Sequence, residues 1–268
     1  MKKALALALV ALPVCVFAEP PAHIDVSKLP SQTKLIDDVV VPVPSEIFGV
    51  LDKLGKQPWA SVQRPINGVV QPIGDAPQIA LMLGSVIAEG FIAVEAEDSN
   101  QVKQIGKSVL NLATPLGVGA EVKKRAQAIT DAADKKDWNG VRKELDGALD
   151  DVKKAMGNLN SEALSQLVSL GGWIRGTEAL TAVVGHSYTK DGAELLHQPM
   201  LIDYFKGRLA NLKPKYRANP VVGRVQKGIL DIRPLIGLAD DVDISEKSVQ
   251  EINGITSDLI KSINSKAP

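Results

Sequence analysis

Apolar residues recur at the three- and four-residue spacing of an α-helix through most of the chain after residue 77. The clearest example follows Asp137, a residue type that suits the position before a helix. Its charged residues lie off the apolar stripe, on the side that faces solvent. The pattern predicts an amphipathic helix packed on a core. Its stripe consists of Trp138, Val141, Leu145, Leu149, Val152, Met156 and Leu159.

The segment from Ile79 to Val94 is apolar on nearly every side. Such a helix is either the core of a soluble protein or a membrane span. Glu89 stands near its middle, and an acidic stretch (95–98) follows it, which argues against a span. We therefore expect this segment to be the central helix of a bundle, and we expect no transmembrane span in the mature chain.

Further helices are separated by short breaks rich in Pro and Gly. One is expected to run from Ser161 to about Val184, with Gly185 as its C-terminal cap. The others are expected to begin at Ser99, near Ala120, at Pro199, at Pro220 and at Ser245. This gives about eight or nine helices. No repeat of fixed period stands out, so a multi-helix, all-α bundle is favoured over a helical solenoid.

The N-terminal quarter has a different composition. Residues 19–76 are rich in Pro, and Pro42 and Pro44 interrupt a run of valines, which excludes a central strand. We expect an extended arm that contains one short helix beginning at Ser45 and that either packs along the helical domain or reaches a partner. Its last part, residues 56–76, is expected to be irregular and to be held over the core by Trp59. Residues 77–268 are then the all-helical domain.

Residues 1–18 have the features of a secretory signal peptide. A Lys pair precedes an apolar run that is short for a membrane span, and Val16-Phe17-Ala18 suits a signal peptidase. The alternatives are a retained anchor helix and a lipoprotein at Cys15, where Val14 does not suit a lipobox. Cleavage after Ala18 leaves a mature chain without Cys and therefore without disulfides. We predict export to the periplasm or the medium, as for a bacterial cell-envelope protein.

Composition excludes some function classes. The chain has 31 Lys and Arg residues against 31 Asp and Glu residues, and nucleic-acid binders are normally basic. Aromatic residues make up only 4% of the chain, and there are three His residues. We therefore expect no nucleic-acid partner and no cofactor, while the oligomeric state stays open.

Three motifs approach catalytic patterns without completing them. Lys107-Ser108 resembles the end of a phosphate-binding loop, but Gln101 stands where that loop needs Gly. His186-Ser187 resembles the nucleophile elbow of the α/β-hydrolases, but Thr189 replaces its second Gly. The acidic run at 240–243 lacks the Gly and the Glu of a calcium loop. We assign no catalytic residue from these motifs.

Metal-ligating residues are few. Glu194 and His197 have the spacing that places two ligands on one helix face, but di-iron bundles need two such pairs. His186 could complete a mononuclear site with these two residues. We expect no metal centre and keep these three residues as the weaker candidates.

One apolar helix contains an unusual cluster of glycines. Gly171, Gly172 and Gly176 each cost about 1 kcal/mol relative to Ala in a helix, so something must approach this backbone closely. One interpretation is tight helix packing beside an ion pair between Arg175 and Glu178, which are three residues apart. The other is a pocket wall whose ligand-binding residues are Trp173, Arg175 and Glu178.

Three functions follow from these patterns. The favoured one is a non-enzymatic, exported helical interaction or scaffold protein with a protein partner in the cell envelope. The first alternative is a periplasmic small-ligand-binding protein with a pocket between helices near Trp173. The second is an enzyme of unrecognised type, which would have to work with carboxylates, Tyr188 or His197 because the mature chain has no thiol.

Overall fold

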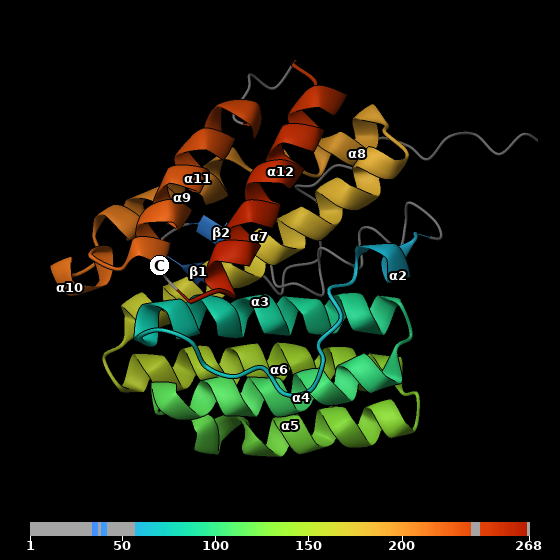
Figure 1. The fold of residues 1–268 in the computed structure, drawn as a ribbon, viewed down its shortest axis with the longest axis vertical. Helices are drawn as coiled ribbons and strands as arrows, with labels where there is room; N and C mark the ends of the chain where they lie inside the picture. The colour runs from blue at the N-terminus through green and yellow to red at the C-terminus, as the bar shows by residue number, and fades with distance from the viewer. Residues whose placement is uncertain (1–33, 37–38, 42–56, 237–241, 267–268) are drawn as a thin grey trace, which may run out of the picture.

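The computed structural model describes residues 34–36, 39–41, 57–236 and 242–266 (Figure 1). Helices dominate these residues, which confirms the predicted all-α, multi-helix bundle. The long helices are α3 (Ala76–Glu95), α4 (Ser99–Ala113), α5 (Gly119–Asp134), α6 (Trp138–Asn158), α7 (Glu162–His186), α9 (Pro199–Ala210), α11 (Pro220–Ile236) and α12 (Glu246–Ile263). The short ones are α2 (Trp59–Val62), η3 (Thr114–Leu116), α8 (Lys190–Glu194) and α10 (Pro214–Arg217).

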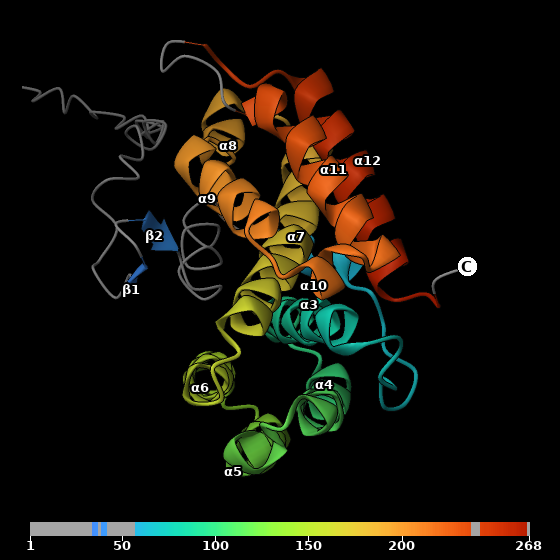
Figure 2. The same cartoon turned by 90° about the vertical axis from the view of Figure 1, so that its left-hand side faces the viewer.

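The long helices form two groups that share one core. Helices α3, α4, α5 and α6 pack in a closed ring of neighbours, which Figure 2 shows nearly end-on. Helices α7, α9, α11 and α12 form the second group, in which α12 packs on α7 and α11 lies between α9 and α12. Helix α7 crosses α3 and so joins the two groups. The buried apolar side chains of both groups belong to one continuous cluster.

Helix α3 is the centre of the fold, as its sequence predicts. Every residue from Pro77 to Val94 is buried. It contacts α4 and α6 in the first group and α7, α11 and α12 in the second. Of the described helices, α3 is the one long and apolar enough to cross a membrane, and its apolar window lies wholly inside the bundle.

Glycines allow α3 and α7 to approach closely. A Cβ atom on Gly171 would lie only 2.8 Å from the carbonyl carbon of Leu81, and one on Gly84 would lie 2.8 Å from the backbone N of Gly172. Carbon atoms in contact are normally about 3.5–4.0 Å apart, so neither position has room for a side chain. The predicted close approach is therefore confirmed at Gly171, and the approaching backbone is that of α3.

Residues 63–74, which we call the covering segment, cross the first group without regular secondary structure. Trp59, in the helix α2 just before this segment, is buried in the core, which confirms its predicted packing there. The segment then runs over α3 and α4 before it reaches the start of α3 (Figure 1).

A row of polar side chains on α4 binds the backbone of the covering segment. Gln101 accepts a hydrogen bond from Ile66 N and donates one to Ile66 O. Ser108 Oγ accepts from Val70 N at 3.0 Å, and Asn111 Nδ2 donates to Val70 O at 2.8 Å. These bonds satisfy backbone groups that have no helix or strand to pair with.

Most predicted helix starts are correct, and two boundaries differ. Asp137 and Ser245 cap their helices as expected, with side chains that accept from Gly140 N and Ser248 N. The cap of α4 is Asp98 and not Ser99, because the Asp98 carboxylate accepts from the backbone N of Gln101. Gly185 does not end α7, which continues to His186.

The described part of the arm contains a pair of short strands. Strand β1 (Lys34–Ile36) pairs antiparallel with β2 (Val39–Val41), with Leu35 opposite Val40. This agrees with the predicted extended character of the valine run. The signal peptide (1–18), Pro42, Pro44 and the short helix expected from Ser45 lie outside the described residues. The division at residue 77 stays a prediction.

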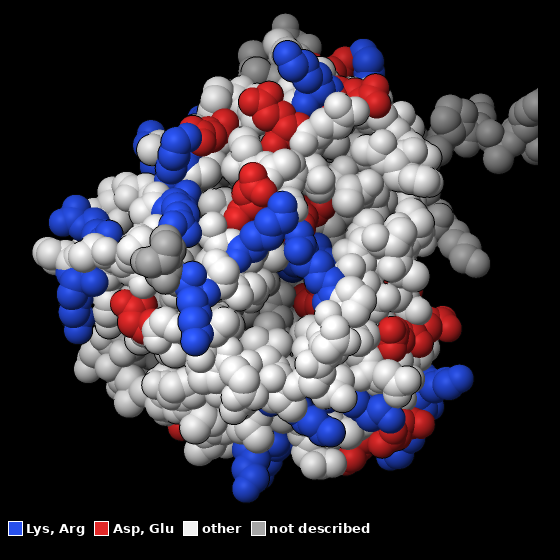
Figure 3. All heavy atoms as spheres, viewed as in Figure 1, with Lys and Arg blue, Asp and Glu red and all other residues white. Residues whose placement is uncertain are grey.

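Charged side chains of both signs are spread over the face in Figure 3. At its left-hand edge Lys and Arg gather over α10 and the adjoining ends of α9 and α11, with few acidic side chains among them. A chain with balanced charge therefore has a locally basic surface.

Candidate functional site

Helix α7 places its three predicted ligand-binding residues on two different faces. Arg175 and Glu178 lie close together on the face toward α3 and the covering segment, where they form an ion pair with Nη1 and Oε2 3.2 Å apart. Trp173 lies on the face toward the chain between α8 and α9. Side chains two positions apart in a helix point about 200° apart around its axis, which explains the separation of Trp173 from Arg175.

Arg175 is the centre of a buried ionic cluster. Its Nε donates to Glu89 Oε2 in α3 at 2.6 Å, and its Nη2 donates to the carbonyl oxygen of Val62 at 2.6 Å. With the bond to Glu178, its guanidinium therefore binds two carboxylates and one backbone oxygen. Only 1% of Arg175 is exposed. Burial of a charged guanidinium is costly, and its bonds to the two carboxylates offset that cost.

Arg64 of the covering segment completes the cluster. Its guanidinium binds both carboxylate oxygens of Glu178 and donates to Ser257 Oγ in α12 at 2.9 Å. Its backbone N donates to Glu89 Oε1 at 2.7 Å. The cluster therefore links α3, α7, α12 and the covering segment.

The charges in this cluster balance. Arg64 and Arg175 face Glu89 and Glu178, so the cluster has no formal net charge, although the Arg64 side chain is 38% exposed at its edge. Burial raises the pKa of Glu89, while the charge of Arg175 and the hydrogen bonds from Arg64 N and Arg175 act in the opposite direction. The hydrogen bond to Glu178 raises the pKa of Arg64. The arrangement suits a fixed structural connection between elements.

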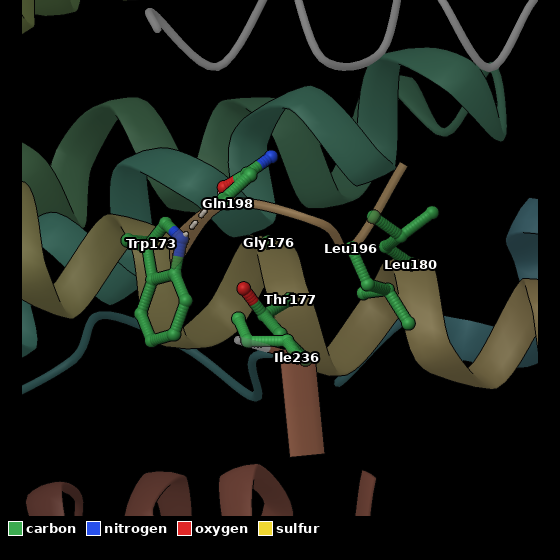
Figure 4. A pocket seen from close by; sticks show the side chains of 7 residues that line it. All are labelled: Trp173, Gly176, Thr177, Leu180, Leu196, Gln198 and Ile236. Carbon is green, nitrogen blue, oxygen red and sulfur yellow. Dashed lines mark hydrogen bonds between the residues drawn. The ribbon is translucent and has the colours of Figure 1, made fainter. Parts of the chain in front are cut away.

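The opposite face of α7 borders a small hollow. Its empty volume is about 310 Å³ with the open solvent at its mouth included, but its cavity volume is only about 10 Å³, which is the space of about one water molecule and far below that of a ligand pocket. Gln198 accepts a hydrogen bond from Trp173 Nε1 at 3.2 Å, and its own Nε2 donates to Leu195 O. The hollow is lined by Trp173, Gly176, Thr177, Leu180, Leu196, Gln198 and Ile236 (Figure 4).

Gly176 differs from the other two glycines of its cluster. A Cβ atom on Gly176 would meet nothing within 4 Å, whereas Gly171 and Gly172 lie against α3. The close approach predicted for this backbone therefore occurs at Gly171 and Gly172 and not at Gly176. Its lack of a side chain instead leaves the hollow open beside Trp173.

The weaker metal candidates lie at the end of α7, at the end of α8 and in the connection between α8 and α9. His186 is the last residue of α7, Glu194 ends α8, and His197 is the third residue after the end of α8. Within the described residues, no group of three or more His, Cys, Asp or Glu side chains is placed to hold a metal ion. Of the acidic run at 240–243, Asp240 and Asp241 lie outside the described residues.

The residues of the apparent nucleophile elbow lie in the connection after α7. Ser187 is the C-terminal cap of that helix, as expected for a loop between two helices. The hydroxyl of Tyr188 donates to the carbonyl oxygen of Ile244 at 2.8 Å. If Tyr188 were a catalytic residue of an enzyme, its hydroxyl would have to break this hydrogen bond, which holds the segment after α7 to the residues just before α12.

Sequence reasoning missed two members of the ionic cluster. It used Glu89 only as an argument against a membrane span and left Arg64 unassigned. The signal was present, because a charge in the middle of an apolar helix requires a partner of opposite sign. Arg175 lies in a similarly apolar stretch, so the pairing of Glu89 with Arg175 could have been inferred. Arg64 could not, because no periodicity places its irregular segment.

Sequence reasoning also missed a local charge bias. Residues 206–227 contain seven Lys and Arg residues and no Asp or Glu. They run from the second half of α9 through α10 into the first half of α11. Six of the seven are exposed, and Arg208 is half-buried. We call this set the basic end, and it consists of Lys206, Arg208, Lys213, Lys215, Arg217, Arg224 and Lys227.

Comparison with known proteins finds no counterpart for this chain. No protein-family model, no curated protein and no solved structure matches it. Its function therefore has to be inferred from its own residues.

Proposed function

We propose that the chain is a non-enzymatic interaction or scaffold protein that is exported to the bacterial cell envelope. The observation that carries this proposal is the basic end. Seven basic residues without an acidic one stand in a chain whose total charge is zero. Random placement would mix the two signs, and a predominantly basic surface attracts a partner of negative charge.

The rest of the fold supplies a rigid support for such a surface. The ionic cluster and the close contact between α3 and α7 fix the second helix group on the first. The charged groups that could do acid–base chemistry at this position are paired with each other. A framework that fixes its buried charges in this way supports binding at its surface.

The leader supports export. Lys2 and Lys3, the apolar run after them and the small residue at Ala18 are the three parts of a secretory signal. We expect the mature chain to begin at Glu19. N-terminal sequencing of the protein from its own cells tests this point, and a chain that still begins at Met1 would contradict it.

Cell fractionation tests the proposal as a whole. We expect the chain in the envelope fraction, from which high salt releases it because the attraction is electrostatic. Replacement of Lys206, Lys213, Lys215 and Arg224 by Gln should move it to the soluble fraction. A chain that stays in the cytoplasm, or that is soluble in the periplasm without salt, would refute the proposal.

A second candidate function is the binding of a small apolar ligand in the hollow beside Trp173, which would have to widen to admit one because its cavity volume is about 10 Å³. The supporting observation is Gly176, whose missing side chain leaves the hollow open at a cost in helix stability. Arg175 and Glu178 have no part in this version, because they do not line the hollow.

Native mass spectrometry of the chain purified from its own host tests the second candidate. A stoichiometric small molecule that Gly176→Leu removes would support it. The control is Gly185→Leu, because a Cβ at this position of α7 also meets nothing within 4 Å. A mass equal to that of the chain alone, or a molecule that both variants retain, would refute this candidate.

A further inference from the structure

We propose that the basic end binds the surface of a lipid bilayer through the phosphates of anionic phospholipid headgroups. This inference rests on the proposed interaction function and names the partner of that surface.

The seven basic residues gather at one extremity of the molecule. Helices α9 and α11 pack against each other, and α10 packs on α11 in the connection between them. The second half of α9 and the first half of α11 therefore lie at the same end. Figure 1 shows α10 at the left-hand edge of the protein, and in Figure 2, which is viewed from that side, α10 faces the reader.

Several of these charges are available for a partner. The side chains of Lys206, Lys213 and Arg224 are exposed and make no hydrogen bond or ion pair with any described residue. Lys206 does lie near Asp203 of its own helix, but that carboxylate is already paired with Arg233; the hydrogen bond from Arg233 lowers the pKa of Asp203, and the charge of Lys206 contributes to the same shift. Lys227 pairs with Asp231, one turn further along α11. The charge of the basic end therefore remains largely uncompensated by its own helices.

Other elements bring a smaller number of charges to this end. Asp75 accepts a hydrogen bond from Asn219 at the start of α11. Near the end of α12, Asp258 pairs with Lys261, so this pair adds no net charge. Glu162 begins α7, whose first turns share a shallow hollow with Arg208. Asp75 and Glu162 thus reduce the positive charge of this end without reversing it.

Two tyrosines lie among the charges. Tyr204 and Tyr216 are half-buried, with Arg208 and Lys215 placed over their rings at 4.9 and 5.0 Å from the centroids. Tyrosine rings favour the boundary between water and the apolar part of a bilayer, because they combine an apolar body with a polar hydroxyl. Their presence beside the charges fits contact with a lipid headgroup layer.

A bilayer fits this surface better than a protein or a nucleic acid. The centre of a protein interface is depleted of charge, especially Lys. The large apolar side chains that are exposed in the described chain, which are Leu159, Met200, Leu230 and Val242, all lie outside 206–227. An exported chain meets phospholipid in the envelope, where nucleic acid is absent.

Vesicle flotation of the purified chain tests the inference. We expect binding to vesicles of phosphatidylcholine mixed with phosphatidylglycerol, and none to vesicles of phosphatidylcholine alone. The attraction is about 1 kcal/mol for each Lys or Arg near an anionic surface. Replacement of Lys206, Lys213, Lys215 and Arg224 by Gln should therefore lower vesicle affinity on the order of 1,000-fold at low salt.

Matched variants separate this surface from net charge. Replacement of Lys123, Lys124, Lys135 and Lys136 by Gln makes the same change in charge on the other helix group, where all four are exposed. We expect this control to keep most of the binding. Replacement of Lys206, Lys213 and Lys215 by Arg should keep it fully, which shows that loss in the Gln variant comes from charge and not from misfolding.

Three results would overturn the inference. They are equal binding to both kinds of vesicle, equal loss in the control variant, and binding to an acidic protein or to nucleic acid in the absence of vesicle binding. A chain that fails with vesicles but is held in the envelope through the same four residues would leave the interaction function intact with a different partner. A chain that binds vesicles but is not exported would refute the proposed function alone.

Discussion

The contact between α3 and α7 makes a sharp prediction for Gly171→Ala. The added Cβ would lie 2.8 Å from the carbonyl carbon of Leu81 and 2.9 Å from its Cα, and nearer still to its carbonyl oxygen. Carbon atoms in contact are about 3.5–4.0 Å apart, so the two helices must separate by about 1 Å. Both sides of the contact are backbone, and neither can rotate away.

The expected loss of stability follows from two opposing effects. Overpacking of a core costs about 1–3 kcal/mol, and contact with rigid backbone belongs at the upper end of this range. Replacement of Gly by Ala in a helix returns about 1 kcal/mol. The net change is a loss of about 2 kcal/mol, which lowers Tm by about 4–8 °C in a chain of this size.

Gly176→Ala is the matched control in the same helix. Its Cβ meets nothing within 4 Å, so only the gain in helix propensity remains. We expect this variant to be stabilised by about 1 kcal/mol. Thermal unfolding followed by circular dichroism gives both values. Shifts of Tm in the same direction for the two variants would refute the account of why these glycines are present.

Three further predictions concern the ionic cluster and one helix cap. Arg175→Met leaves the Glu89 carboxylate buried without its guanidinium partner and should lower the free energy of unfolding by about 3–5 kcal/mol in urea denaturation. The control Arg233→Met breaks a more exposed pair and should lower it by less than about 1 kcal/mol. Similar losses in the two variants would contradict the buried arrangement. Burial raises the pKa of Glu89, so the folded chain holds the proton of this carboxyl more tightly than the unfolded chain does. The free energy of unfolding of the native chain, relative to that of Glu89→Gln, should therefore fall as pH rises from 4.5 through the folded pKa. A difference between the two chains that does not change with pH would contradict this. Asp137→Ala removes the cap of α6 and should cost about 1 kcal/mol, measured by thermal unfolding.

The helical fold follows from local patterns, which is why it could be predicted. Asp137 and Ser245 mark helix starts because capping depends on residues only two or three positions away. The same local reasoning missed α8 and α10, which have only five and four residues and no repeated apolar spacing. It also ended α7 too early at Gly185, because a helix glycine and a capping glycine look alike in sequence.

The candidate site depends on contacts between distant residues, so only part of it could be predicted. The pair of Arg175 with Glu178 is local and was predicted. The bonds of Arg64 to Glu178 and to Ser257 join residues 114 and 193 positions apart, which no periodicity reveals. The separation of Trp173 from Arg175 is a consequence of helix geometry, and the helical spacing alone could have shown it.

The covering segment has a consequence for the order in which the chain folds. It leaves the ribosome before every helix from α3 onward, yet its Arg64 needs Glu178 in α7 and Ser257 in α12. Contacts between such distant positions form late, because the intervening chain must first be ordered. We therefore expect the covering segment, although it is synthesised before the long helices, to dock among the last elements, after both helix groups have formed.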